Sequence, residues 1–220
     1  MIAESKRTNQ RKGWIWVAAA CMLLPAALSA SGQTGIDKQG ELYLGGQPGA
    51  PVKIEVYSDY QCPVCRTYYL ETLKPLLADY AKTNKLDKIC IVYHDFPLVD
   101  IHQFARKAAR FALAAQHLSR ERWLRVTDAL YTEQDKWSQD GNIEAALGKM
   151  LDPTEVLRMQ TIAAEPAIDA VVDQEILLGQ SRNITSTPTS FIITETGRQQ
   201  RVTGMVPLSI LKDFVDKLVK

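Results

Sequence analysis

Hydrophobic patterns divide the chain from residue 52 onward into predicted strands and helices. Apolar and polar residues alternate over 52–57, which predicts a β-strand. Over 62–82 the apolar residues recur every three or four positions, which predicts a helix. Pro75 predicts a kink or break in this helix, because proline removes a backbone hydrogen bond. The apolar run 89–96 then predicts a second strand.

The segment from about residue 101 to about residue 180 has helical spacing throughout. This block of about 80 residues is longer than a crossover between two strands requires, so it predicts a separate helical subdomain. Gly179 is expected to end its last helix, since glycine is common just after helix C-termini. Three aromatic residues of the block are expected to pack in its core, with a lining of a substrate groove as the alternative; they are Trp123, Tyr131 and Trp137.

Strand patterns return in the last part of the chain. Residues 190–194 and 200–204 flank a turn that contains Gly197, which predicts an antiparallel hairpin. Pro207 then opens a final amphipathic helix. The order strand, helix, strand, helical block, strand, strand, helix predicts an α/β fold, with one central mixed sheet flanked by helices and an inserted all-helical subdomain.

The first 30 residues have a different character. Four basic residues precede an apolar run from Trp14 to Ala30, which ends in small residues, a pattern typical of a secretory signal peptide. The run of about 17 residues is also at the lower limit for a retained membrane anchor. Both alternatives stay open, and both export the following domain to the periplasm or another extracytoplasmic space.

Composition and pattern together predict the organisation of the chain. Residues 31–50 are rich in Gly, Ser, Gln and Pro, which is typical of a linker, and 41–44 can form a short strand within it. The predicted parts are a signal peptide or anchor at 1–30, the linker at 31–50, the first half of the sheet domain at 51–100, the helical insert at 101–182 and the second half of the sheet domain at 183–220.

Charge and cysteine content narrow the function. The 26 basic and 25 acidic residues nearly cancel, which disfavours a nucleic-acid partner. Export would place the domain where disulfides persist, so its cysteines become informative. Cys62 and Cys65 are separated by two residues, whereas Cys90 lies alone in an apolar run and is expected to be a small buried residue.

The pair of cysteines lies where the predicted strand 52–57 meets the predicted helix 62–82. Backbone N–H groups at a helix N-terminus stabilise a thiolate, which is the reactive form of cysteine. Cys62 and Cys65 therefore predict disulfide exchange. A structural disulfide or half of a zinc site are the alternatives, but a zinc site takes four ligands and the histidines lack ligand spacing. No metal and no cofactor are predicted.

Four segments of the chain carry a family resemblance. They are SDYQCPVC at 58–65, YHDFPL at 93–98, HQFARKAARFALAAQ at 102–116 and TSTPTSFII at 185–193. Together they resemble the DsbA-like family of thiol-disulfide oxidoreductases, and the combination of CPVC with TPTSF is the specific part. The resemblance implies a thioredoxin-like fold and an enzyme that acts on protein thiols and disulfides.

The same resemblance implies roles for individual residues. Cys62 is implied to be the exposed nucleophile, and Cys65 the more buried partner. Thr187 and Pro188 are similar to the family's cis-proline segment, whose backbone binds an extended substrate in the manner of an added strand.

Two departures from the family pattern concern the tuning of the cysteine pair. Pro63 and Val64 separate the cysteines, whereas the family's strongest oxidants carry a histidine at the second of these positions. We therefore expect a less oxidising pair. Val56 stands where family members often carry a buried glutamate. Glu55 is one step away along the strand, hence on the opposite face, and is expected to be solvated.

The remaining titratable residues near these segments are expected to be structural. Asp59 is interpreted as a turn residue near the cysteines, with a direct effect on the thiol pKa as the alternative. His94, His102 and His117 are interpreted as structural or surface residues.

The favoured interpretation is an exported enzyme that oxidises dithiols in substrate proteins and that a membrane partner reoxidises. A disulfide reductase or isomerase with the same cysteine pair is one alternative. A peptide-binding, chaperone-like module without redox turnover is another. The sequence names neither the substrates nor the direction of electron flow.

Overall fold

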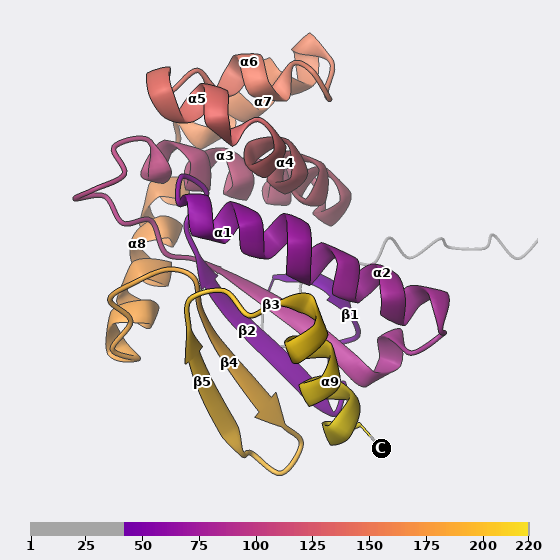
Figure 1. Ribbon diagram of the computed structural model, residues 1–220. Helices are drawn as coiled ribbons and strands as arrows, with labels where there is room; N and C mark the ends of the chain where they lie inside the picture. The colour runs from indigo at the N-terminus through magenta and orange to yellow at the C-terminus, as the bar shows by residue number, and fades with distance from the viewer. Residues whose placement is uncertain (1–41, 220) are drawn as a thin grey trace, which may run out of the picture. The chain divides into compact units, whose positions relative to one another are not determined.

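The computed structural model describes residues 42–219, in which five strands form one mixed sheet (Figure 1). The strands are β1 (Tyr43–Gly46), β2 (Val52–Ser58), β3 (Ile89–Asp95), β4 (Thr189–Thr194) and β5 (Gln199–Thr203). Their order is β1-β3-β2-β4-β5; β2 and β3 run parallel, and the other neighbours run antiparallel. The predicted leader and the first part of the predicted linker lie outside the described residues. No helix within 42–219 has the length and hydrophobicity to cross a bilayer.

Helices cover both faces of this sheet. They are α1 (Pro63–Tyr68), the π-helical turn η1 (Tyr69–Leu73), α2 (Lys74–Lys82), the 3-10 turn η2 (Leu86–Lys88), α3 (Ala105–Leu118), α4 (Arg120–Thr132), α5 (Gln134–Asp140), α6 (Ile143–Leu147), α7 (Pro153–Ala163), α8 (Pro166–Ser181) and α9 (Leu208–Leu218). α1, η1, α2 and α9 lie over one face, α8 packs against the other, and α3 to α7 form a helical insertion (Figure 1). The predicted α/β fold with an inserted helical subdomain is confirmed.

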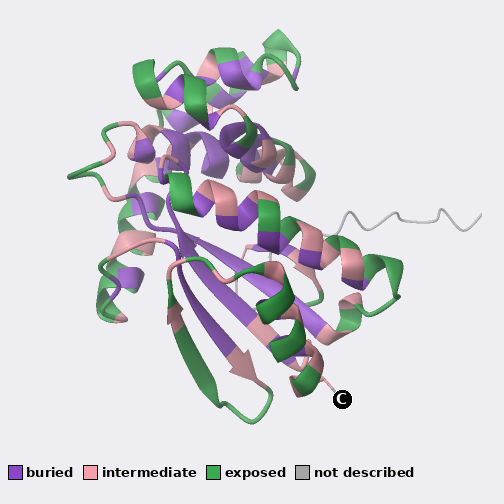
Figure 2. Ribbon diagram, viewed as in Figure 1, coloured by how far each residue is buried: buried purple, intermediate pink, exposed green. Residues whose placement is uncertain are grey.

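The central strand β2 is buried on both faces. Val52, Ile54 and Val56 belong to the main core, together with leucines of η1, α2 and α9. Tyr57 belongs to a second apolar cluster with Ile184 and Phe191, on the side that α8 covers. Alternation along this strand therefore separates two buried faces rather than a buried face and a solvated one, as the burial colours of β2 show (Figure 2).

The helix that follows β2 contains the irregularity predicted at Pro75. The chain stays helical from Pro63 to Lys82, but η1 forms a π-helical turn directly before this proline. Proline cannot donate to the carbonyl of Glu71, and its ring presses on that carbonyl. A π turn widens the helix at that point and accommodates the ring without ending the helix.

The helical insertion has an aromatic core. Trp123, Tyr131 and Trp137 are buried there, so the expectation that these residues pack in the core is confirmed. The ring of Tyr131 also lies 5.1 Å from that of Tyr60 and 4.8 Å from that of Tyr69, so this residue joins the insertion to the first half of the sheet domain. The hydrophobic pattern does not separate α5 from its neighbours, because most of its residues are polar.

Gly179 does not end α8, and this prediction is wrong. The helix continues to Ser181 with Gly179 buried inside it. A Cβ atom at position 179 would lie 2.3 Å from the ring of Phe96. Glycine is present because the Phe96 ring packs directly on the helix backbone.

We expect Gly179→Ala to lower the free energy of unfolding by about 1–3 kcal/mol, because the added methyl group overpacks against Phe96 and outweighs the better helix propensity of alanine. Chemical denaturation measures the change. Gln180→Ala, at the exposed neighbouring position of α8, is the control and is expected to change the free energy of unfolding by less than about 0.5 kcal/mol. Equal stability of Gly179→Ala and the wild type would contradict the close packing.

Candidate active site

Cys62 lies at the N-terminus of α1, as the sequence predicts. It is the N-cap residue, with an extended backbone (φ −72°, ψ 120°), and its carbonyl accepts a hydrogen bond from the N–H of Arg66 at 3.1 Å. Pro63 occupies the first helical position, where a missing N–H leaves no bond unmade. The backbone N–H groups of Val64 and Cys65 favour the thiolate of Cys62 and lower its pKa. The start of the helix thus surrounds this sulfur with donors.

The two thiols are free and differ in burial. Cys62 exposes 6% of its surface and Cys65 exposes 1%. Cys65 is the more buried of the two, as the resemblance implies, but Cys62 is also buried and is not the exposed nucleophile that the resemblance implies. The carbonyl of Thr187 lies 3.5 Å from the Cys62 sulfur, and Val64, which is 43% exposed, is the open side chain beside the pair.

The pKa values of the two thiols move in opposite directions. A hydrogen bond from the Cys65 thiol, with support from the N–H groups at the start of α1, lowers the pKa of Cys62 to about 6 against the effect of burial. Burial, followed by the neighbouring Cys62, raises the pKa of Cys65 well above its ordinary value. At neutral pH the pair therefore holds one thiolate, on Cys62, and one thiol, on Cys65.

A buried polar network lies around Cys65. The N–H of Asp59 points at the Cys65 sulfur at 3.5 Å. Ser58 shares a hydrogen bond of 2.8 Å with the hydroxyl of Tyr131, which shares a second one, of 2.7 Å, with the hydroxyl of Tyr93. Burial raises the pKa of both tyrosines well above the ordinary value, so the network is neutral. Burial outweighs the hydrogen bonds from Ser58 and from the N–H of Asp59, so Cys65 keeps its proton.

The segment before β4 faces the cysteine pair from the other half of the sheet domain. The Thr187–Pro188 peptide bond is cis, as the resemblance implies. The carbonyl of Pro188 accepts a hydrogen bond from the N–H of Gly204 at 2.8 Å, which ties the segment to the end of β5. The carbonyl of Thr187 is left facing Cys62. The structure thus brings together four residues that the sequence singled out from two distant segments, namely Cys62, Cys65, Thr187 and Pro188.

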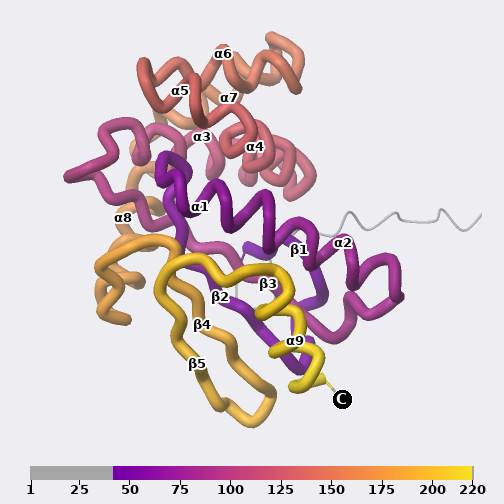
Figure 3. The backbone as a smooth tube through the Cα atoms, in the orientation of Figure 1, coloured from indigo at the N-terminus to yellow at the C-terminus, as the bar shows by residue number. Residues whose placement is uncertain are grey.

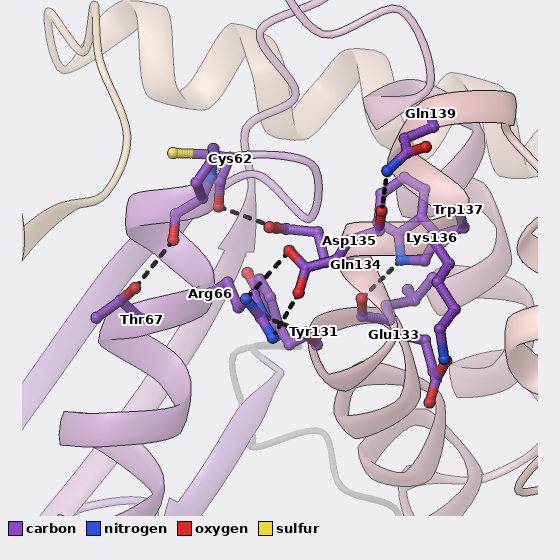
Figure 4. A network of polar contacts seen from close by, with 12 residues as sticks. Cys62, Arg66, Thr67, Tyr131, Glu133, Gln134, Asp135, Lys136, Trp137 and Gln139 are labelled. Atoms are coloured by element: carbon purple, nitrogen blue, oxygen red, sulfur yellow. Dashed lines mark hydrogen bonds and ion pairs between the residues drawn. The ribbon is translucent and has the colours of Figure 1, made fainter.

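The helical insertion holds the start of α1 through a residue that the sequence analysis missed. The side-chain amide of Gln134, at the start of α5, donates to the carbonyl of Cys62 at 3.0 Å (Figure 4). The same amide donates to the carbonyl of Tyr60 at 2.7 Å. Arg66 donates to the carbonyl of Tyr131 at 2.9 Å and forms an ion pair with the side chain of Asp135 (Figure 4). A lone polar residue in a helix gives no signal in sequence that it reaches a distant backbone.

The position of the family's buried glutamate contains no acid. Val56 is buried in the main core. Glu55 lies on the opposite face of β2, as predicted, but it is 5% exposed and forms ion pairs with Lys53 and Arg182, so the prediction that it is solvated is wrong. Burial raises the pKa of Glu55, but its two cationic partners outweigh burial and lower it overall. Arg182 follows α8, and no local pattern indicates that it returns to β2.

The fold and the arrangement of thiols define a thioredoxin-fold thiol-disulfide oxidoreductase. A family model described as Thioredoxin matches residues 38–206, and the chain belongs to this family. The prediction of a DsbA-like oxidoreductase is confirmed by this match and by the similarities that follow.

Three known proteins illustrate the similarity. Disulfide bond formation protein D of Bacillus subtilis is 25% identical over 174 residues, which cover 74% of this chain and 72% of that protein. The crystal structure of DsbA2 from Pseudomonas aeruginosa is 25% identical, with a TM-score of 0.59, and the match covers 79% of this chain and 92% of that one. That of the thiol-disulfide exchange protein alpha-DsbA2 from Wolbachia pipientis has a TM-score of 0.65 at 22% identity, covers 83% and 88% of the two chains, and supports the fold.

We expect alkylation of Cys62 in the reduced protein to reach half its maximal rate at about pH 6, because the thiolate reacts and the donors around Cys62 lower its pKa to about 6. Rates measured with iodoacetamide over a pH series test this, with peptide mapping to separate the cysteines. Cys65 is expected to stay unmodified across this range. Unfolded protein is the control, because its cysteines should titrate near an ordinary value of about 8.5. A folded Cys62 that titrates there would contradict the assignment.

We expect Gln134→Ala to lower the free energy of unfolding by about 1–3 kcal/mol, because it leaves the carbonyl of Tyr60 without a donor and removes one of the two donors to the carbonyl of Cys62. Gln139→Ala is the matched control: this side chain is exposed and donates within its own helix, so the effect should be below about 0.5 kcal/mol. Denaturant unfolding compares the two. Equal losses in both variants would show that Gln134 does not hold the start of α1.

Proposed function

We propose that this protein is an exported oxidase of protein dithiols, in which Cys62 exchanges disulfides with substrates and Cys65 is its partner in the redox-active disulfide. The observation that carries the proposal is the position of Cys62 at the N-terminus of α1, beside the buried Cys65 and facing the Thr187 carbonyl; the opposite shifts of the two pKa values, to about 6 for Cys62 and well above the ordinary value for Cys65, support it. Catalytic cysteines of this kind need one stabilised thiolate and one protected thiol. A purely structural disulfide would need neither.

The reaction begins with the oxidised Cys62–Cys65 disulfide. A substrate thiolate attacks the Cys62 sulfur, the Cys62–Cys65 bond breaks, and Cys65 leaves with the electron pair and takes up a proton. A second substrate thiolate then attacks the substrate sulfur of this mixed disulfide, and Cys62 leaves as the thiolate. The substrate loses two electrons and two protons and gains a disulfide, while the cysteine pair becomes the dithiol.

The stability of the leaving thiolate supports the oxidising direction. A low pKa makes Cys62 a good leaving group and stabilises the dithiol form, so the disulfide form readily accepts two electrons from a substrate dithiol. Val64 supplies no charge to the thiolate, which supports a less oxidising pair than a histidine at that position would give. A membrane partner would reoxidise the dithiol by accepting its two electrons. The basic and apolar pattern of 1–30 supports export.

Thr187 and Pro188 are proposed to bind the substrate backbone. The carbonyl of Thr187 faces the Cys62 sulfur, so an extended peptide paired with this segment would bring its cysteine next to Cys62. Val64, between the two cysteines, and Met205, which follows Gly204, are exposed apolar residues, and they would contact an unfolded substrate chain. The substrates are thus proteins that present a cysteine in an extended segment.

We expect Cys65→Ala to accumulate mixed disulfides between Cys62 and substrate proteins in cells, because its Cys62 thiolate displaces one sulfur of a substrate disulfide and no neighbouring thiol then releases the bound substrate. Non-reducing gel electrophoresis detects the complexes, and a reductant should release them. The double variant Cys62→Ser/Cys65→Ala should form none. Cys90→Ala is the control for a buried thiol outside the site and should leave oxidation of a reduced substrate unchanged. Absence of Cys62 complexes would remove the proposed function.

The direction of electron flow is tested separately by thiol trapping in cells. A pair found mostly as the disulfide supports an oxidase, whereas a pair found mostly as the dithiol supports a reductase or isomerase. If cells that carry Cys62→Ser keep the function of the wild-type protein, the protein acts as a peptide-binding module without redox turnover.

A further inference from the structure

A buried carboxylate links His102 to the turn that precedes the cysteine pair. The side chain of Asp59 is fully buried and accepts three hydrogen bonds. Oδ1 accepts from the N–H of Gln61 at 2.7 Å, and Oδ2 accepts from the N–H of Leu98 at 2.9 Å. The third partner is Nδ1 of His102, at 2.7 Å from Oδ2. These bonds hold the imidazole of His102 against the turn between β2 and α1.

The backbone of Asp59 contacts both cysteines. Its carbonyl accepts from the N–H of Cys62 at 3.1 Å, and its N–H points at the Cys65 sulfur at 3.5 Å. Asp59 therefore holds His102 through its side chain and the two cysteines through its backbone. An ordinary turn accounts for the bond from Gln61, two residues on, but not for the bonds from Leu98 and His102.

His102 places a positive charge near this pair. Its side chain is 18% exposed, and the hydrogen bond to Asp59 raises its pKa, with further contributions from the negative charges of Asp59 and Cys62 and against a smaller opposing effect of burial. Asp95 faces Asp59 from the end of β3, but burial raises its pKa well above the ordinary value, so it is neutral. Arg66, one turn along the helix, is a second cation near the pair, and it forms an ion pair with Asp135 as His102 does with Asp59.

We propose that His102, held by Asp59, is the cation that stabilises the Cys62 thiolate in the dithiol form of the enzyme. This inference rests on the proposed function of the pair and adds a residue to its tuning. His102 is a positioning residue in this scheme, because it acts on Cys62 through charge and forms no bond with the substrate. The interaction is present when Cys62 is a thiolate and absent when Cys62 is in a disulfide, so it favours reduction of the pair.

The first test compares alkylation of Cys62 in the wild type and in His102→Gln, whose amide can still donate to Asp59 but carries no charge. At pH 5 we expect the rate to fall by about tenfold, because loss of a nearby opposite charge shifts the thiolate population to higher pH. At pH 9, where both proteins hold the thiolate, the rates should agree within about twofold. His117→Gln, at an exposed position of α3, is the matched control and should follow the wild-type profile.

The second test needs no variant at His102. An NMR titration follows the His102 ring in the dithiol and in the disulfide form of the wild-type protein. Because coupling between two sites is reciprocal, His102 should titrate at higher pH in the dithiol form. A histidine with a merely structural role would titrate at the same pH in both forms.

The outcomes separate this inference from the proposed function. If wild-type Cys62 titrates like an ordinary thiol, the proposed function fails. If wild-type Cys62 has its low pKa but His102→Gln follows the same pH profile, or the His102 titration is the same in both redox forms, the role of His102 is overturned and the function of the pair stands. Should His102→Gln not fold, the wild-type titration decides.

Discussion

Cys62 and Cys65 share one proton in surroundings that treat the two sulfurs unequally. Cys65 lies against a neutral, buried network, where a charge would be costly, so it keeps the proton and donates it as a hydrogen bond to Cys62. Cys62 collects further donors from the first N–H groups of α1. This asymmetry requires a fixed helix start, a buried neutral network beside Cys65 and the segment before β4 facing Cys62. Each of the other structural features near the pair supplies one of these.

Three segments that are distant in sequence meet at the pair, as the path of the chain shows (Figure 3). The turn after β2 carries the cysteines, the insertion contributes Gln134 and Tyr131, and the segment before β4 contributes the Thr187 carbonyl. The insertion therefore does more than extend the chain between two strands. Gln134 fixes the carbonyl side of the helix start, and Tyr131 forms part of the buried network beside Cys65.

Local patterns in the sequence predict the features of the structure that depend on residues close together in the chain. The strands, the helix with its irregularity at Pro75, the cysteine pair at a strand-to-helix junction and the hairpin after Pro188 all follow from spacing and turn chemistry. Contacts between distant residues are not encoded in this way. In the sequence, Glu55 resembles a solvated strand residue. In the folded chain it is buried and forms an ion pair with Arg182, which follows α8. In the same way, His102 has no ligand or motif spacing, and its pairing with Asp59 exists only in the folded chain.

The low pKa of Cys62 links redox state to folding. Its folded pKa of about 6 lies below the ordinary value, so it stabilises the folded dithiol fully above that ordinary value, and the contribution is lost as the pH falls towards 6. A disulfide between residues three apart closes a very short loop, so it removes little entropy from the unfolded chain and stabilises the oxidised form little. A fold that is stabilised more in its dithiol form than in its disulfide form must have a redox equilibrium displaced towards the dithiol, since the two processes form one thermodynamic cycle. Under the proposed function, the free energy by which the folded protein stabilises the Cys62 thiolate is therefore also the source of the oxidising power of the pair.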